Sequence, residues 1–203
     1  MSQPLSIQKT NVHICPHQMA FMLDNWFRRW IQHPKKIAGE YVRQGDTVFD
    51  IGCGPGYFSI DLAKMVGEAG TVYAVDVQAS MLSKVKKKAE RHGVAQRMVF
   101  HQCGADRIGL NQTADFILAY YMIHETPDPK SFLAELKTML KPQGKLLVVE
   151  PRMHVSQASF ESMVADAQDA GMKAVAFPKG KGGRGVLLRI VLNGDSLNGF
   201  NPL

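Results

Sequence analysis

From residue 46 onward, short runs of β-forming residues alternate with stretches whose apolar residues recur at helical spacing. The first run, 47–51, is apolar almost throughout, as expected for a strand that is covered on both faces. Such alternation is typical of consecutive strand–helix units, which place parallel strands in one sheet between two layers of helices. We therefore predict an α/β fold: a three-layer sandwich around a mostly parallel sheet.

The same two patterns, runs of β-forming residues and apolar residues at helical spacing, predict the other elements. Further strands are expected at about 71–75, 98–103, 116–121, 145–149, 173–177 and 185–192, and helices at about 58–66, 79–92, 129–140 and 156–170. The segment Lys141–Gly144 is expected to end the preceding helix before the fifth strand. Only a loop joins the last two strands, so they are expected to be antiparallel neighbours, because a parallel pair needs a longer crossover.

The first 45 residues differ from the rest. They hold two helical patterns, 17–31 and 34–42, and the first carries more large apolar side chains than one buried stripe needs. Packing on the sheet edge would explain this pattern, and so would a lid over the strand ends. The predicted organisation is a helical segment or lid at 1–45, one ligand-binding domain at 46–193 and a flexible tail at 194–203.

Composition excludes several broad classes. No apolar run approaches the roughly 18 residues that a membrane span needs, so no membrane partner is expected. The net charge of +6 would suit a polyanion, but six of the cations gather within 84–97, mostly on the outer face of an expected helix. The three cysteines show no paired spacing, which favours a reducing, cytoplasmic compartment.

A metal site is not expected. His13, Cys15 and His17 alternate, but no second Cys/His pair follows at the spacing of a zinc finger. A polar lead-in to a helix explains the pattern better.

Three glycines, Gly52, Gly54 and Gly56, follow the first expected strand and open a helix. A glycine-rich turn lets the backbone approach a ligand and offers it free amides. Asp50 precedes the turn, where it can hold the loop amides or an amine of the ligand. Asp76 ends the second strand, twenty residues after Gly56, where a carboxylate accepts both hydroxyls of a ribose. These residues predict a nucleoside ligand beyond the strand ends.

The rest of the motif narrows the choice of ligand. No Gly-x-x-x-x-Gly-Lys-Ser/Thr segment is present, which disfavours a nucleoside triphosphate. Pro55 lacks the amide that a dinucleotide pyrophosphate requires at the start of the helix.

Four segments now identify a resemblance. Residues 48–56 read Val-Phe-Asp-Ile-Gly-Cys-Gly-Pro-Gly, and 74–77 read Ala-Val-Asp-Val; both resemble motifs of class I S-adenosylmethionine-dependent methyltransferases. Residues 115–128, with His124 and Pro127-Asp128, resemble the fourth-strand segment of members that act on small molecules. Residues 140–146 resemble the segment before strand five, with Gln143 where glycine is usual. The similarity spans about 40–192.

The resemblance implies seven strands in the order 3-2-1-4-5-7-6, with strand seven antiparallel. It also implies that S-adenosylmethionine is the methyl donor and S-adenosylhomocysteine the product. The glycines would pass under the methionine portion, Asp50 would lie near its amino group, and Asp76 would hold the ribose. The implied cofactor-binding residues are Asp50, Gly52, Gly54, Gly56, Asp76, Val77, Met81, Gly104, Ala105 and Tyr120, of which Val77 and Met81 would flank the adenine.

Adenine recognition departs from the family pattern. Many relatives end strand three in Gly-Asp-Ala, whereas 102–106 reads Gln-Cys-Gly-Ala-Asp. Either Asp106 contacts the adenine through a shifted register, or a backbone group near Cys103 and Gly104 does.

An acceptor that carries a proton needs a base to remove it. The candidates lie after strands four and five: Tyr120, Tyr121, His124, Glu125, Glu150, Arg152 and His154. His124 is the preferred base, and Tyr120 and Glu150 complete the predicted catalytic set. The alternative interpretation of His124 is a side chain that only holds its loop in place.

The acceptor itself is expected to be a small molecule. Cations at the expected rim favour an anionic one; they are Arg28, Arg29, Arg152 and Lys179. Nucleic acid is not expected, because 120–124 reads Tyr-Tyr-Met-Ile-His instead of the Asn/Asp-Pro-Pro-aromatic run of amino-methylating enzymes. An RNA or protein methyltransferase, a dehydrogenase, and a nucleotide-binding protein without transferase activity stay as alternatives. Nothing in the sequence indicates an oligomeric state.

Overall fold

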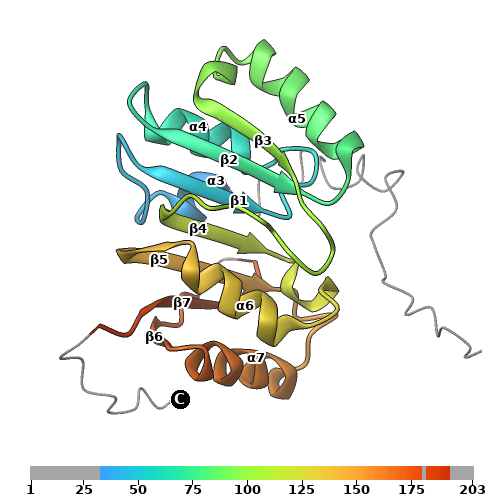
Figure 1. The fold of residues 1–203 in the computed structure, drawn as a ribbon, viewed down its shortest axis with the longest axis vertical. Helices are drawn as coiled ribbons and strands as arrows, with labels where there is room; N and C mark the ends of the chain where they lie inside the picture. Colours follow the sequence, from blue (N-terminus) through green and yellow to red (C-terminus); the bar gives the residue numbers. More distant parts are fainter. Residues whose placement is uncertain (1–32, 180–181, 193–203) are drawn as a thin grey trace, which may run out of the picture.

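A seven-stranded sheet forms the centre of the molecule (Figure 1). The computed structural model describes residues 33–179 and 182–192. The strand order is β3-β2-β1-β4-β5-β7-β6. The strands are β1 (Thr47–Ile51), β2 (Thr71–Asp76), β3 (Met98–Gln102), β4 (Ala114–Tyr120), β5 (Leu140–Glu150), β6 (Met172–Ala176) and β7 (Arg184–Ile190). β7 pairs antiparallel with β5 and β6, and the other pairs are parallel. The predicted strand order and direction are confirmed.

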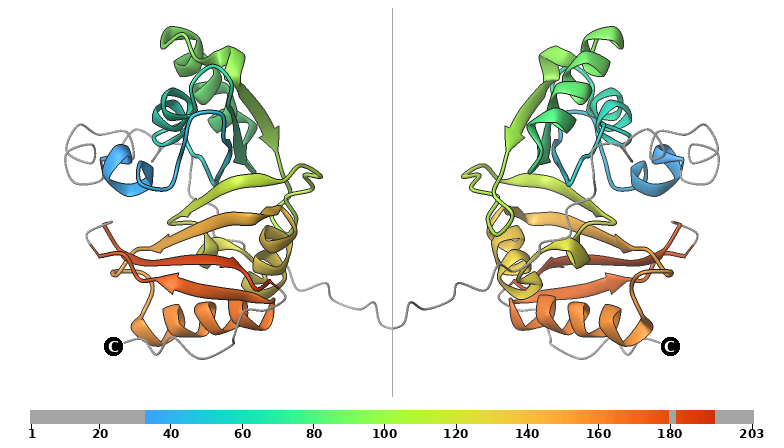
Figure 2. Two further views of the ribbon diagram at one scale, coloured as in Figure 1. Left: turned by 90° about the vertical axis from the view of Figure 1, so that its left-hand side faces the viewer. Right: turned by 90° about the vertical axis from the view of Figure 1, so that its right-hand side faces the viewer.

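Helices cover both faces of the sheet (Figure 2). One core lies between the sheet and α3 (Pro34–Ala38), α4 (Ser59–Val66) and α5 (Ala79–Arg91). The other lies between the sheet and α6 (Pro129–Thr138) and α7 (Gln157–Asp169). Alternate residues of β4 enter the two cores: Phe116 and Leu118 enter the first, Ile117 and Ala119 the second. This period of two explains why the strand is apolar throughout.

The helix before Lys141–Gly144 does end there, but the strand expected from residue 145 begins earlier, because β5 starts at Leu140 and includes this segment. Leu140 pairs with Ala114 of β4, and the register shifts before Lys145 pairs with Phe116. A Cβ on Gly144 would lie 2.7 Å from the carbonyl oxygen of Ala114. The glycine therefore permits a close strand contact instead of ending the strand.

The helix expected at 34–42 is also shorter than predicted, because α3 ends at Ala38. The amide of Gly39 bonds to the Lys35 carbonyl at 3.0 Å and closes the last turn, after which the chain continues in turns to Val42. The helix expected at 17–31, the proposed lid and the tail lie outside the described residues.

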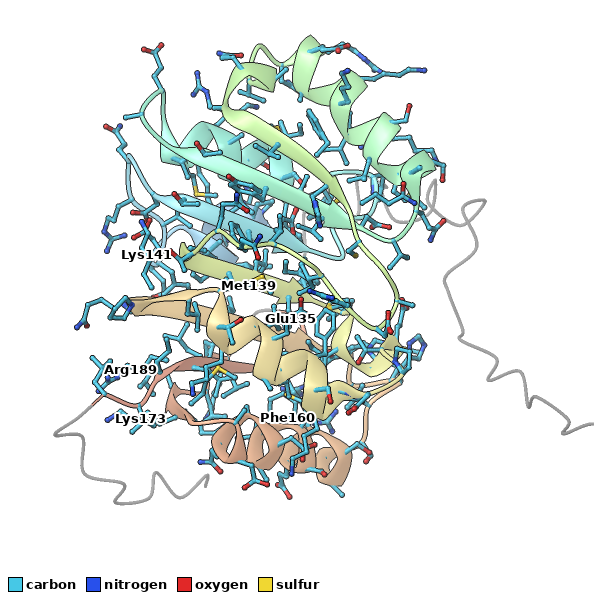
Figure 3. All side chains as sticks on the ribbon, viewed as in Figure 1. Glu135, Met139, Lys141, Phe160, Lys173 and Arg189 are labelled. Atoms are coloured by element: carbon cyan, nitrogen blue, oxygen red, sulfur yellow. The ribbon has the colours of Figure 1, made fainter. Side chains whose placement is uncertain are left out.

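The parallel strands end at one edge of the sheet, on the right in Figure 1. We call this the carboxyl edge: the segments that come directly after β1, β2, β3, β4 and β5. Figure 3 shows Lys141, Lys173 and Arg189 at the opposite edge. None of the helices within the described ranges is long and apolar enough to span a membrane.

Candidate active site

The glycine turn after β1 packs against Met122 at Gly52 and has space beside Gly54 in the described part of the chain. Gly52 and Gly54 have φ angles of +68° and +52°, in the left-handed region that favours glycine. A Cβ on Gly52 would come within 2.8 Å of the Met122 side chain, whereas one on Gly54 would meet no atom of the residues that the structure describes within 4 Å. Room for a ligand beside the backbone therefore exists at Gly54.

Asp76 closes this turn from the end of β2. Its Oδ2 accepts a hydrogen bond from the Gly54 amide at 2.8 Å, and its Oδ1 accepts one from Gln78 at 2.8 Å. Burial raises the pKa of Asp76, while the amides of Gln78, Gly54 and Val77 oppose that rise. Because a carboxylate oxygen accepts more than one hydrogen bond, Asp76 can still accept hydroxyls from a ligand.

Asp50 is buried under the turn and is 2% exposed. It accepts a hydrogen bond from the Ser59 hydroxyl at 2.5 Å, so in this structure its partner is the first residue of α4. Burial raises the pKa of Asp50 to about 7, and the nearby charge of Asp76 adds to the rise.

The other expected cofactor residues lie along the same edge. Gly56 packs against α5, where an added Cβ would lie 3.0 Å from a methyl of Val85. Val77 is half-buried, and its carbonyl accepts from the Gln102 side chain at 3.1 Å. Met81 is buried in the first turn of α5.

Gly104 and Ala105 come after β3. Gly104 is exposed, and its amide bonds to the Arg107 carbonyl at 2.9 Å. The preceding residue, Cys103, bonds through its amide to the Asp76 carbonyl at 3.2 Å. The backbone after β3 therefore lies next to Asp76, and the exposed Asp106 lies beyond it.

His124 and Glu150 form a pair at the ends of neighbouring strands. His124 lies in the 3-10 turn η3 (Ile123–Glu125), and its Nδ1 is 2.5 Å from Glu150 Oε2. Glu150 Oε1 accepts from the Ile123 amide at 3.0 Å, and the Glu150 side chain is 2% exposed. With Nδ1 as the donor, Nε2 of a neutral His124 carries the lone pair that can accept a proton.

The surroundings of His124 set its charge. The hydrogen bond to Glu150 has the largest effect on the pKa of His124 and raises it. Burial of the ring lowers this pKa, and the charges of Glu150 and Glu125 raise it further. The ring of His154 lies with its centroid 6.1 Å away. Burial also raises the pKa of Glu125. The protonated form of His124 is therefore stabilised.

Tyr120 ends β4 and pairs with Val149, the residue before Glu150 in β5. It is buried, and its ring centroid is 4.6 Å from that of Phe58, just before α4, and 4.3 Å from that of Tyr121. The predicted catalytic residues Tyr120, His124 and Glu150 thus all lie at the ends of β4 and β5, but the only bond among their side chains that the described contacts include is that of His124 to Glu150.

Comparison with known proteins identifies the family. A model of the family described as "Methyltransferase domain" matches residues 43–189. The chain belongs to the methyltransferase-domain family. The resemblance to class I S-adenosylmethionine-dependent methyltransferases is confirmed.

Solved and curated relatives agree with this membership. A crystal structure of a SAM-dependent methyltransferase from Aquifex aeolicus superposes with a TM-score of 0.77 at 30% identity, covering 87% of this chain and 99% of that one. The ubiquinone/menaquinone biosynthesis C-methyltransferase of Cellvibrio japonicus is 33% identical over 124 residues, 61% of this chain and 49% of that protein. A demethylmenaquinone methyltransferase of Oceanobacillus iheyensis is 29% identical over 109 residues, 54% of this chain and 46% of that protein. The chain spans about half the length of the curated relatives it matches.

The methyltransferase domain also contains site residues that the sequence did not indicate. Met122 fills the space beside Gly52, and Ser59 bonds to Asp50. Ser59 lies nine residues after Asp50, and this spacing could have indicated the contact because the glycine turn brings the chain back to the strand end. Met122 carries no such signal in the sequence.

Some expected site residues are not described. The expected rim cations Arg28 and Arg29 precede the first described residue. Of the expected rim cations, Arg152 and Lys179 are described, and both are exposed. Across 33–179 and 182–192, no group of three or more His, Cys, Asp or Glu side chains is placed to hold a metal ion.

Proposed function

We propose that this chain is an S-adenosylmethionine-dependent methyltransferase that acts on a small molecule. The observation that carries the proposal is the placement of the His124–Glu150 pair on the same edge as the open glycine turn and Asp76. A nucleoside site beside a positioned base is what methylation of a protonated acceptor needs. The alternatives, an RNA or protein methyltransferase or a protein without transferase activity, are not favoured by the relatives.

The residues present fit S-adenosylmethionine. The open side of Gly54 gives room for a ligand next to the buried Asp76 carboxylate, which is suited to ribose hydroxyls. Asp50 lies below the turn, and its negative charge when ionised suits the positive amino and sulfonium groups. When bound, the cofactor supplies a methyl group on a positively charged sulfur. The residues proposed to hold it are Asp50, Gly52, Gly54, Gly56, Asp76, Val77, Met81, Gly104, Ala105 and Tyr120.

His124 is the proposed general base. Its Nε2 would accept the hydroxyl proton of the acceptor, and the oxyanion that results would be the nucleophile toward the methyl group that the bound cofactor supplies, with S-adenosylhomocysteine as the other product. Attack through a ring carbon would also release the proton of that carbon. Glu150, held by the Ile123 amide, fixes the ring through Nδ1 and stabilises the imidazolium that results.

The proposed acceptor is a hydroxylated aromatic compound of the quinol type. The names of the relatives point to quinones, and the rings of Phe58, Tyr120 and Tyr121 form an aromatic cluster at the end of β4, the strand that leads to His124. A quinol also carries the acidic proton that His124 would remove. An anionic group on the acceptor stays part of the proposal, supported by the exposed Arg152 and Lys179. A cytoplasmic location is supported by the free thiols of Cys53 and Cys103.

Methyl transfer to reduced quinones tests the function directly, with S-adenosylhomocysteine formation as the measurement. Dihydroxynaphthalenes with and without a ring carboxylate compare neutral with anionic acceptors. A His124→Ala variant should lose turnover by about a hundredfold or more while it keeps its affinity for S-adenosylhomocysteine. His92→Ala, a substitution of an exposed histidine after α5, is the matched control and should leave turnover unchanged. Normal turnover in His124→Ala would contradict the role of the base.

A further inference from the structure

The backbone at the end of β4 has an unusual conformation. Tyr121 has φ +61°, and among the described residues it is the only non-glycine residue with a positive φ. A side chain with a Cβ disfavours this left-handed region, and such residues gather at functional sites where the surroundings hold them.

Three contacts hold Tyr121 in place. Its amide donates to the Val149 carbonyl of β5 at 2.8 Å, and its hydroxyl donates to the Gly182 carbonyl at 2.5 Å. Its ring packs on Tyr120 with 4.3 Å between centroids. An added Cβ on Gly183 would lie 3.2 Å from the Tyr121 ring, so the chain before β7 is closely packed against it.

The turn at Tyr121 sets the direction of the segment after β4. The next residue, Met122, lies against Gly52, and the chain then enters η3. Within η3, the Ile123 amide and the His124 ring both bond to Glu150. An extended backbone at Tyr121 would direct this segment away from Glu150 and from the glycine turn.

We propose that Tyr121 is a positioning residue whose left-handed backbone directs His124 onto Glu150. The proposal deepens the proposed function, because the consequence for catalysis rests on His124 acting as the base. The pairing itself can be measured without any activity, so the two proposals can fail separately.

Two variants that differ mainly in backbone preference test the proposal. Tyr121→Asn and Tyr121→Val both remove the ring and the hydroxyl, but asparagine tolerates the left-handed region and valine does not. The pKa of His124, measured by NMR titration, reports the pairing; the other ionisable groups that face this histidine are Glu125, Glu150 and His154. The elevated pKa should persist in Tyr121→Asn and fall toward its ordinary value in Tyr121→Val. The value of kcat should be about tenfold lower in Tyr121→Val than in Tyr121→Asn.

Equal His124 titrations in the two variants would overturn the proposal, whether both keep the elevated pKa or both lose it. If Tyr121→Val does not fold, Tyr121→Gly provides the second comparison. Glycine adopts the left-handed region freely, so this variant should keep the elevated pKa. A folded Tyr121→Gly protein in which His124 titrates at its ordinary pKa would also overturn the proposal. If methyl transfer fails in every variant and in the unmodified protein, the proposed function is wrong, and the titrations still decide the role of Tyr121.

Discussion

Single residues at the carboxyl edge combine burial with charge. Asp50, Asp76 and Glu150 are the buried carboxylates of the described chain, and each ends or nearly ends a parallel strand. Burying a carboxylate costs free energy unless hydrogen bonds compensate it. Asp50 accepts a hydrogen bond from Ser59, and Asp76 accepts two from backbone amides. Glu150 is bonded to the Ile123 amide and to the His124 ring. Such costly groups are typical of a site that binds or reacts.

The pH dependence of turnover should report the His124–Glu150 pair. Since Glu150 raises the pKa of His124 and a base must be neutral, kcat/KM should rise with pH through a midpoint above 6.5. Glu150→Gln removes the negative charge, so the midpoint should move to lower pH, and the plateau should fall by about tenfold or more because the ring is held less well. A midpoint that does not move in Glu150→Gln would show that this pair does not control the rate.

Asp50 should make the protein less stable as the pH rises. Its folded pKa of about 7 lies above the ordinary value of 3.8, so the unfolded chain ionises first, and stability is lost between about pH 4 and pH 7. Asp50→Asn removes this titration. Its unfolding midpoint, measured without ligand, should therefore exceed that of the unmodified protein by more at pH 8 than at pH 5. A larger gain at pH 5 would contradict the burial of an ionisable Asp50.

Elements beside the sheet hold the loops that reach the site. α6 carries Glu135, whose carboxylate accepts from the Ile108 amide at 3.0 Å and the Gly109 amide at 2.8 Å. Figure 3 shows Glu135 on the helix face toward this segment. The segment from Cys103 to Thr113 contains no helix or strand, so its course depends on such side-chain contacts.

Removing that anchor should destabilise the fold. Glu135→Ala leaves the two amides without their charged acceptor, which should lower the free energy of unfolding by about 1–3 kcal/mol. Glu68→Ala removes an exposed carboxylate at the end of α4 and should change it by less than about 0.5 kcal/mol. Denaturant unfolding of both variants gives the comparison. Equal losses of unfolding free energy in the two variants would show that the hydrogen bonds of Glu135 do not stabilise the fold.

Across the whole molecule, charge separates by location. The buried carboxylates lie at the carboxyl edge, Lys141, Lys173 and Arg189 lie at the opposite edge, and Lys84, Lys86 and Lys87 are exposed on α5. Much of the net charge of +6 therefore lies away from the described site. When they are ionised, the carboxylates at the carboxyl edge suit the positively charged sulfonium of the proposed cofactor, whereas Arg152 and Lys179 suit an anionic acceptor.

Binding of the cofactor product should stabilise the whole domain. S-adenosylhomocysteine at about 100 times its Kd should add about 2.7 kcal/mol and raise the unfolding midpoint by about 5–10 °C. Asp76→Asn should lose most of this rise, and NAD should produce none. A rise with NAD alone would point to a dehydrogenase instead.

The sequence by itself determined the features that depend on residues close together along the chain. Periods of two and 3.6 residues located the strands and helices, and the turn at 52–56 with Asp76 predicted where a nucleoside would bind, because a strand end and its turn are read within a few residues. The strand order came from motifs of the family, which one chain's periodicity does not contain. Where local signals and tertiary pairing conflicted, as at Gly144, the expectation failed because Ala114 of another strand decides the course of the chain.

Only the tertiary structure decided which side chains meet. His124 and Glu150 are 26 residues apart, and they pair because β4 and β5 are in a register that sets Tyr120 beside Val149, so that both segments leave the sheet together. Met122 meets Gly52 across β1 and β4 for the same reason. The left-handed backbone at Tyr121 results from contacts with Val149, Gly182 and Tyr120, none of which the residue's own identity predicts. Sequence pattern thus indicated the edge of the sheet that carries the proposed site, and strand register decided the geometry there, because register is a property of pairs of distant segments.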